Sequence, residues 1–489
     1  MAEPPMAELP TDLHWMSATE LASAIANKKT SSVEALDHFV TRIETLDGPI
    51  NSVVQWDLER ARSAAERADQ AVTAGEPLGP LHGVPMTIKD SFQTEGCITT
   101  SGAPELADFV PDEDAWPVAG LRRAGAIPFA KTNLPIWAGD IQSFNDVYGT
   151  TNNPWDLDRT PGGSSGGSAA ALAMGFTPIE LGSDIGGSIR VPAHYSGVMG
   201  HKPSYAAVPA HGQIPGLPGT LTMADLAVAG PMARTAEDLR TSLLAMAGPD
   251  RWNAPGWTLQ FPPSRCEQLA DLRLAVWADD DYCPVGNATR TAIESVADQL
   301  RKSGAHVDDT ARPDFTLEKA ARVFRHLLSA AMSGGYPMSE LDLLAADTRD
   351  TLAGEANRST AMRHREWLSD NERRLQIRRK FEDFFTNYDA IIMPVQPRTA
   401  IPHDHSPDMH ERLVDIDGVE RSYIELFTWI APAGLAYLPA TVVPIGFDGD
   451  GLPIGVQIVG PYLHDMTTIR VGELIAEISD GCPRPALAE

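Results

Sequence analysis

The chain has 489 residues, enough for one large α/β domain or for several ordinary ones. Its 66 acidic and 39 basic residues give a net charge of -27, which disfavours nucleic acids and anionic membranes as partners because phosphate groups require a positive surface. A hydrophobic content of 43% and a charged content of 21% are typical of a folded globular protein and argue against a disordered one.

The four cysteines predict neither a zinc site nor a disulfide framework. They are scattered through the chain and form no C-x-x-C pair: Cys97, Cys266, Cys283 and Cys482. The N-terminus lacks the basic start and apolar core of a signal peptide, and no run of roughly 18 apolar residues is long enough to span a bilayer. We therefore expect a protein of the reducing cytoplasm that does not enter a membrane.

The first elements in chain order are three helices within residues 17–72. Ser17 and Glu20 stand at the spacing of a capping box, in which each side chain bonds the other residue's backbone amide, and residues 31–34 repeat the pattern. A third helical run follows over residues 58–72. The simplest interpretation is that these helices cover one side of a sheet, and a lid or partner role is the alternative.

Strand and helix signals then alternate. Residues 84–89 form a short apolar run that predicts a buried strand ending at Lys89, an unusual place for a lysine. Helices are expected at 115–123 and 168–174, with a strand at 127–130 between them, and a further strand and helix at 272–277 and 288–302. This alternation predicts an α/β fold. Residues 359–385, rich in arginine and glutamate, predict a long solvated helix.

Three segments carry the chemistry. Residues 82–90 read His-Gly-Val-Pro-Met-Thr-Ile-Lys-Asp, residues 161–168 read Pro-Gly-Gly-Ser-Ser-Gly-Gly-Ser, and residues 182–190 read Gly-Ser-Asp-Ile-Gly-Gly-Ser-Ile-Arg. A serine is a weak nucleophile that needs a base within hydrogen-bond reach, and a lysine serves as that base when burial keeps it neutral. Glycines beside a serine leave amide groups free to hold an oxyanion. Without such a role, the same glycines would form a tight turn, and Ser164 and Ser165 would cap a helix.

Two other interpretations of the motifs stay open at this point. Residues 162–166 also fit G-x-S-x-G, the nucleophile elbow of α/β-hydrolases, which would make Ser164 the nucleophile with His194, His201 or His211 as base. That elbow requires a strand directly before it, whereas residues 151–161 are polar and contain proline. A second possibility is a metal site at His403, His405 and His410, which the irregular, proline-containing segment disfavours.

The three motifs, in this order and spacing, resemble the amidase signature family of serine hydrolases. The similarity extends to residues 152–156, 197–203, 388–394 and 451–460 and is weakest over about 252–387. The resemblance implies one large α/β domain over residues 1–489, with a mixed central β-sheet covered on both faces by helices. The variable, mostly helical residues 252–387 would contribute to the substrate pocket.

The resemblance also implies the roles of the site residues. Ser188 would be the nucleophile, Ser164, after a cis peptide bond, the proton relay, and Lys89 the base. The amides of Ser188 and of the three residues before it, Ile185, Gly186 and Gly187, would form the oxyanion hole. Asp184 and Arg190 would pair to hold this loop without reacting. No metal and no cofactor is implied.

The substrate implied is a small amide, ester or carbamate, cleaved at its acyl bond through an acyl-enzyme, by a monomer or homodimer. Residues 137–141 lie where family members place the acyl pocket, which would be formed by Trp137, Ala138, Gly139, Asp140 and Ile141. Phe324, Tyr336 and Trp367 would supply its other side. An aryl or medium apolar amide, anilide or carbamate is the expected substrate. The alternatives are the amidase subunit of the tRNA-dependent amidotransferase, which works in a complex, and a binding protein without activity.

Overall fold

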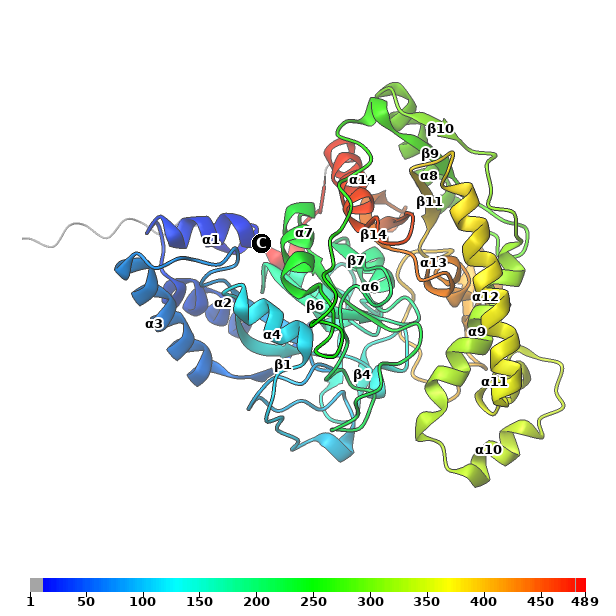
Figure 1. The fold of residues 1–489 in the computed structure, drawn as a ribbon, viewed down its shortest axis with the longest axis horizontal. Coiled ribbons are helices and arrows are strands. Elements are labelled where there is room, and N and C mark those ends of the chain that lie inside the picture. The colour runs from blue at the N-terminus through cyan, green and yellow to red at the C-terminus, as the bar shows by residue number, and fades with distance from the viewer. Residues whose placement is uncertain (1–11, 480) are drawn as a thin grey trace, which may run out of the picture.

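A single mixed β-sheet forms the centre of the molecule. The computed structural model describes residues 12–479 and 481–489, and within them the chain folds as one large α/β domain (Figure 1). The sheet has eleven strands in the order β1 (Val53–Trp56), β3 (Ile127–Thr132), β2 (Pro85–Lys89), β6 (Ile179–Asp184), β8 (Val228–Ala233), β7 (Met199–Lys202), β14 (Ala440–Phe447), β15 (Pro453–Val459), β11 (Ala390–Pro394), β9 (Arg273–Val276) and β10 (His306–Asp308). The predicted mixed sheet and single α/β domain are therefore confirmed.

Helices surround this sheet, and two short hairpins lie outside it. The hairpins are β4 (Phe144–Asn145) with β5 (Gly149–Thr150), and β12 (Leu413–Ile416) with β13 (Val419–Ser422). The helices are α1 (Ala18–Ala26), α2 (Ser32–Leu46), α3 (Leu58–Ala74), α4 (Trp116–Arg123), α5 (Gly166–Ala173), α6 (Arg190–Ser196), α7 (Ala236–Met246), α8 (Asn287–Lys302), α9 (Leu317–Ala331), α10 (Met338–Ala345), α11 (Leu352–Thr360), α12 (His364–Phe384), α13 (Ala431–Leu435) and α14 (Asp465–Ile478).

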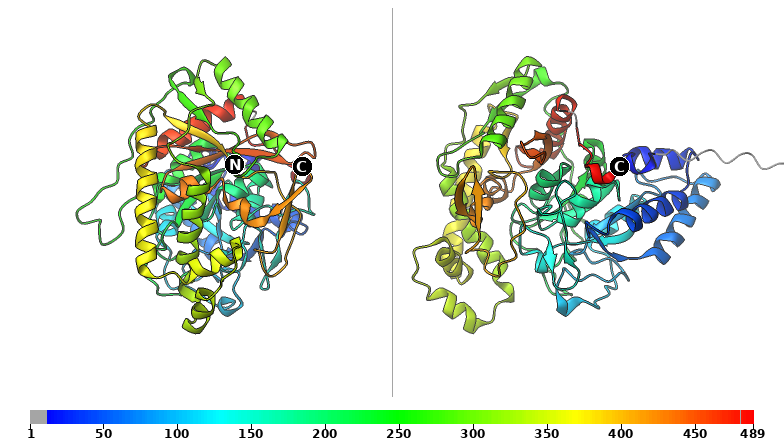
Figure 2. Two further views of the ribbon diagram at one scale, coloured as in Figure 1. Left: turned by 90° about the vertical axis from the view of Figure 1, so that its right-hand side faces the viewer. Right: turned by 180° about the vertical axis from the view of Figure 1, so that it is seen from behind.

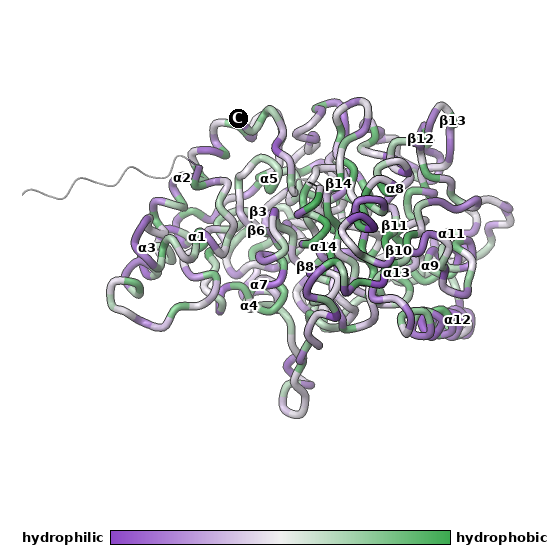
Figure 3. The backbone as a smooth tube through the Cα atoms, turned by 90° about the horizontal axis from the view of Figure 1, so that it is seen from above, coloured by the Kyte–Doolittle hydropathy of each residue, from purple (hydrophilic) through white to green (hydrophobic). Residues whose placement is uncertain are grey.

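Alternating side chains along the strands divide the core into two apolar clusters. On β11, Ala390 and Ile392 belong to a cluster with α2, α4, α7, α8 and α14, whereas Ile391 and Met393 belong to one with α5, α6, α9, α12 and α13. Because successive side chains of a strand point to opposite faces, the two clusters are the two covered faces of the sheet. Figure 3 shows hydrophobic strands at the centre of the molecule and largely hydrophilic helices α3 and α12 at its two ends.

The two ends of the molecule carry the N-terminal helices and the variable region. Figures 1 and 2 place α1 to α3 at one end and α9 to α12 at the opposite end. Both predicted capping boxes, at Ser17 and Ser31, are present with reciprocal side-chain and backbone bonds. The long helix expected at 359–385 is α12, which is mostly exposed but buries Ile377 and Phe381.

Parallel pairing between two central strands positions the site. β2 runs parallel to both β3 and β6, and its five residues are all buried. The carboxyl ends of parallel strands meet at the same edge of a sheet. Lys89, the last residue of β2, is therefore brought beside Asp184, the last residue of β6, and beside the loop that follows it. The prediction that a buried strand ends at Lys89 is confirmed.

Candidate active site

Lys89 is completely buried and contacts two hydroxyl groups. Its Nζ lies 2.6 Å from Ser164 Oγ and 2.9 Å from Ser183 Oγ. Burial lowers the pKa of Lys89 to about 7, against the opposing effect of the negative charges of Asp184 and Glu180. A large fraction of this lysine is therefore a neutral amine near neutral pH, as a general base must be.

Ser164 follows the cis peptide bond Gly163–Ser164, and this feature of the motif is confirmed. Position 163 must be a glycine, because a Cβ there would lie 2.7 Å from the carbonyl oxygen of Asp140 and 2.8 Å from the amide nitrogen of Gln142. Helix α5 begins two residues after Ser164, and the amide of Ser165 donates to the carbonyl of Ser188 at 3.1 Å. The two serine segments are thus joined directly.

The loop after β6 is held by a buried ion pair. Arg190 Nη2 and Nε donate to the two carboxylate oxygens of Asp184 at 2.9 and 3.0 Å, and both side chains are fully buried. Burial is the largest single effect on Asp184 and opposes its ionisation, but the charge and hydrogen bonds of Arg190, the charge of Lys202 and the amide of Gly187 together lower the pKa of that carboxyl. Asp184 also accepts from the amides of Gly187 and Ile189, at 3.0 and 3.2 Å. The predicted pairing of Asp184 with Arg190 is present.

One predicted oxyanion donor is used elsewhere. The amide of Gly187 donates to Asp184, so it is not free to face a substrate, and the expectation for Gly187 needs correction. Within residues 12–479 and 481–489, the amides of Ile185, Gly186 and Ser188 have no protein acceptor. Gly187 instead supplies a left-handed backbone turn, with a φ of 95°, that few other residues adopt.

Ser188 is buried but is the most exposed of the three predicted catalytic residues. Its exposed fraction is 5%, compared with 1% for Ser164 and none for Lys89. In the described part of the chain its hydroxyl has no hydrogen-bond partner, so the contact from Ser188 to Ser164 that a relay needs is not formed in this structure. Catalytic hydrogen bonds are often long in the free enzyme and shorten with substrate bound.

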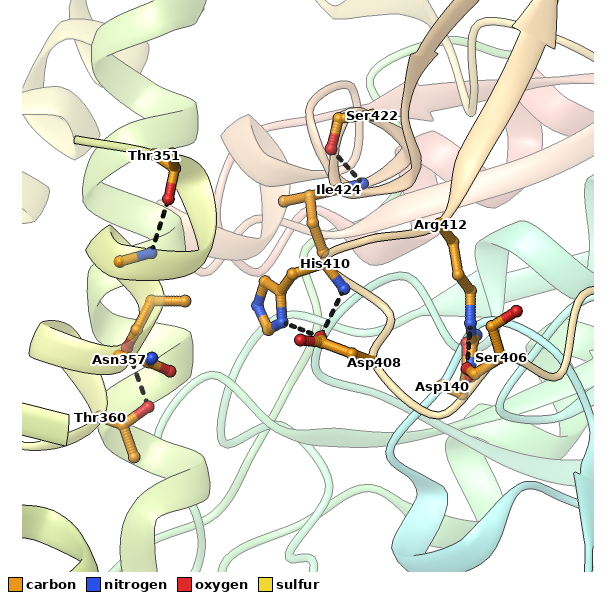
Figure 4. Close-up of polar contacts among 12 residues, drawn as sticks. Asp140, Thr351, Asn357, Thr360, Ser406, Asp408, His410, Arg412, Ser422 and Ile424 are labelled. Atoms are coloured by element: carbon orange, nitrogen blue, oxygen red, sulfur yellow. Dashed lines mark hydrogen bonds and ion pairs between the residues drawn. The ribbon is translucent and has the colours of Figure 1, made fainter. Parts of the chain in front are cut away.

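The predicted pocket segment, residues 137–141, packs directly behind the relay serine. Trp137 and Ala138 have positive φ angles of 53° and 55°, and both are half-buried. Gly139 is exposed and Ile141 is buried in the core. Asp140 is paired with Arg412 at 2.6 Å, as Figure 4 shows, and also accepts from Tyr423 at 2.6 Å. Its carboxylate is thus occupied within the protein.

The three residues expected in the opposite wall lie in different surroundings, and their role in a pocket stays a prediction. Phe324 is fully buried against Gly434, and Tyr336 is 43% exposed at the surface. Trp367 stacks on His364. Among the side chains that reach the loop of Ser188 are Phe427 and, on α9, Leu328, whose carbons would lie 3.3 and 3.8 Å from a Cβ on Gly186. Sequence reasoning missed both, because neither belongs to a motif.

Two polar residues near Lys89 were also missed. Ser183 provides the second hydroxyl contact of Lys89, and Glu180 is a buried carboxyl on the same strand, β6. Ser183 lies in the same motif as Ser188, residues 182–190, and this position could have identified it as a residue near the site. Glu180 stood in an apolar strand sequence, where a charged residue is rare, and that was the signal for it.

The alternative sites receive little support. No strand directly precedes Ser164, and both ring nitrogens of His194 and of His201 bond to other groups. In the predicted metal segment, His405 stacks on Phe144 at 3.8 Å and His410 bonds Asp408 (Figure 4). Residues 12–479 and 481–489 contain no group of three potential metal ligands. That the protein needs no metal or cofactor stays a prediction.

None of the helices described is both long enough and apolar enough to cross a membrane. The four cysteines are free. The cytoplasmic location and the monomeric or dimeric state stay predictions.

Comparison with known proteins gives consistent matches along the chain. The model of the amidase family matches residues 34–469. A subunit of the glutamyl-tRNA(Gln) amidotransferase of Synechococcus sp. (strain CC9311) is 32% identical over 493 aligned residues, covering 95% of this chain and 97% of that protein.

Solved structures are similar over the same length. An inhibitor-bound structure of a vestigial protein complex, described as revealing the origins of an s-triazine catabolic enzyme, has a TM-score of 0.80 at 27% identity, covering 96% of this chain and 99% of that one. A 6-aminohexanoate cyclic dimer hydrolase complexed with substrate has a TM-score of 0.79 at 25% identity, covering 98% and 100%.

The ion pair beneath the nucleophile loop predicts a large loss of stability when it is broken. Arg190→Met leaves the carboxylate of Asp184 buried without its partner, so the free energy of unfolding should fall by about 3–5 kcal/mol. Urea unfolding followed by fluorescence measures this. Arg301→Met is the control, because Arg301 pairs with Asp298 and Asp309 at the surface and should change stability by about 1 kcal/mol or less. Equal effects of the two substitutions would contradict the prediction.

Proposed function

The chain belongs to the amidase family, and from this premise we propose that it is a serine hydrolase that cleaves carboxylic amide C–N bonds of apolar or aryl substrates. The observation that carries the proposal is the 2.6 Å contact between the buried amine of Lys89 and Ser164, next to the loop of Ser188. This contact supports the proposal that a base, Lys89, and a proton relay, Ser164, lie beside the nucleophile, Ser188. The proposed site uses no metal.

In the proposed reaction, Ser188 Oγ attacks the substrate carbonyl. Its proton passes to Ser164, whose own proton passes to Lys89, and Lys89 becomes an ammonium. The amides of Ile185, Gly186 and Ser188 bind the oxyanion that forms. When the C–N bond breaks, Lys89 returns its proton through Ser164 to the leaving amine. Water then cleaves the acyl-enzyme by the same relay, and Ser188 is regenerated. Esters and carbamates share the tetrahedral step and would react as well.

The preference for an apolar acyl group follows from the side chains beside the oxyanion donors. Phe427 and Leu328 lie against Gly186, and both are partly exposed within an otherwise buried apolar cluster. Apolar side chains of this kind bind an aryl or alkyl group by removing its surface from water. The nearest charged pair on the pocket segment, Asp140 with Arg412, is already neutralised internally.

A second candidate function is the amidase subunit of a tRNA-dependent amidotransferase. The observation in its favour is the similarity to a glutamyl-tRNA(Gln) amidotransferase subunit over nearly the whole chain. The two candidates differ in what the isolated chain can do. Hydrolysis of p-nitroanilides and aryl carbamates by the purified chain, without glutaminase activity, favours the first, whereas glutamine hydrolysis that needs added partner subunits favours the second.

A fluorophosphonate probe should label Ser188. Only an activated serine reacts, and Ser188 retains some exposure beside three unpaired amides. Intact-mass analysis should show one adduct, which Ser188→Ala abolishes. Peptide mapping gives the position. An adduct on Ser164 would support the nucleophile elbow instead.

The pH dependence of turnover should report Lys89. Because the base must be unprotonated, kcat/KM should rise as the pH increases through about 7, the pKa to which burial lowers this lysine. Lys89→Ala should slow anilides more than activated esters, because the amine leaving group needs a proton and a phenolate does not. Steady-state rates on a matched anilide and ester measure this difference. Near-native anilide turnover in Lys89→Ala would rule out the relay.

The apolar wall should set the preference for the acyl group. Phe427→Ala should lower kcat/KM for an aryl acyl anilide by roughly 10- to 100-fold, corresponding to about 1–3 kcal/mol of lost apolar contact. The acetyl anilide, which is too short to use the wall fully, should be affected much less. An equal loss for both substrates would place Phe427 outside the acyl pocket.

A further inference from the structure

A carboxyl group lies buried behind the proposed base. Glu180 of β6 has an exposed fraction of 1%, and its Cα is the register partner of Thr87 on β2. Its Oε1 accepts two hydrogen bonds, from Thr87 Oγ1 at 2.6 Å and from Thr132 Oγ1 at 3.0 Å. The proposed catalytic steps do not use this group.

The surroundings of Glu180 and Lys89 overlap. Thr87 and Lys89 are two residues apart on β2 and therefore share one face of the sheet. Thr132, the second donor to Glu180, is the register partner of Lys89 on β3. Ser168 of α5, the helix that begins just after the relay serine, bonds Thr132 at 2.9 Å. Glu180 and the relay are thus connected through one layer of side chains.

The hydrogen bonds of Glu180 fit a neutral carboxylic acid. Both hydroxyl donors bond Oε1, as they would a carbonyl oxygen, while the buried Oε2 has no partner in the described residues. An unpartnered oxygen costs more when it carries negative charge than when it carries a proton. In accord with this geometry, burial raises the pKa of Glu180 to about 7.

The other charged groups around the relay have their own partners. Asp184 is paired with Arg190, the Nζ of Lys202 on β7 bonds two carbonyl groups, and Lys131 on β3 lies 3.9 Å from Asp90. Glu180 is not among the carboxylates paired with a basic side chain in the described residues. When Glu180 loses its proton, its negative charge raises the pKa of Lys89 and also that of Lys131.

We propose that Glu180 is a positioning residue of the relay, a second buried proton-binding group whose charge shifts the balance between the neutral amine and the ammonium of Lys89. This inference rests on the proposed function of Lys89 as base. A neutral Glu180 favours the neutral amine, and an ionised Glu180 favours the ammonium. Because the negative charge of Glu180 raises the pKa of Lys89, the ionisation of the two groups is linked.

The test is the pH dependence of Ser188 labelling in Glu180→Gln. Glutamine keeps an oxygen for the two threonine hydroxyls but cannot ionise. Without the negative charge that favours the ammonium, the acidic limb of the labelling rate should move to lower pH by roughly half a unit or more, which is about a threefold higher relative rate on that limb. Glu180→Asp, which restores an ionisable carboxyl, should return the limb toward its original position.

A control variant and a substitute variant separate the possible outcomes. Asp238→Asn makes the same change at another buried carboxyl, on α7, which bonds the amides of Ala18 and Thr19 and is not among the charges that act on Lys89, so it should leave the limb in place. Should Glu180→Gln fail to fold, Thr87→Val removes one bond to the carboxylate, favours neutral Glu180 and should shift the limb in the same direction. Labelling at Ser188 with an unmoved limb in folded Glu180→Gln or Thr87→Val overturns the inference. Absence of any labelling at Ser188 in the unmodified chain overturns the proposed function instead.

Discussion

A lysine amine without contact to water is the constraint around which this site is organised. Burying an ammonium without a partner costs several kcal/mol, so the amine must be neutral or compensated. Lys89 is surrounded by the hydroxyl groups of Ser164 and Ser183 and by two carboxyl groups: Asp184, which is paired with Arg190, and Glu180, whose pKa burial raises to about 7. This balance brings the ionisation of Lys89 close to neutral pH, where a small change in charge nearby has a large effect on the fraction of free base.

The second organising element is the carboxylate of Asp184. It accepts hydrogen bonds from Arg190 and from two loop amides at once, and these bonds hold the backbone of the loop in place. The amides that Asp184 does not bind are left at the surface of the site beside Ser188. A charged, fully buried pair thus determines which backbone groups of the loop are available to a substrate.

The sequence predicted the parts of the site that are local. The strand ending at Lys89 follows from a short apolar run, and the N-terminal capping boxes follow from residue spacing. The cis bond before Ser164 followed from resemblance. What could not be predicted depends on contacts between distant residues: Asp140 with Arg412, 272 positions apart, and Phe427 with Gly186. The use of the Gly187 amide also depends on the exact direction of one side chain, which composition does not reveal.

The packing of Gly163 against the backbone of residues 140–142 has a consequence for how such enzymes diversify. Since no side chain fits between these segments, the backbone path of residues 140–142 and the position of Ser164 depend on each other. Insertions or deletions in residues 137–142 would move the backbone on which Gly163 packs, whereas substitution of a side chain without an internal partner would leave that backbone in place. New substrate ranges are therefore most accessible through substitutions at constant loop length, and a directed-evolution library for this protein is best built in that way.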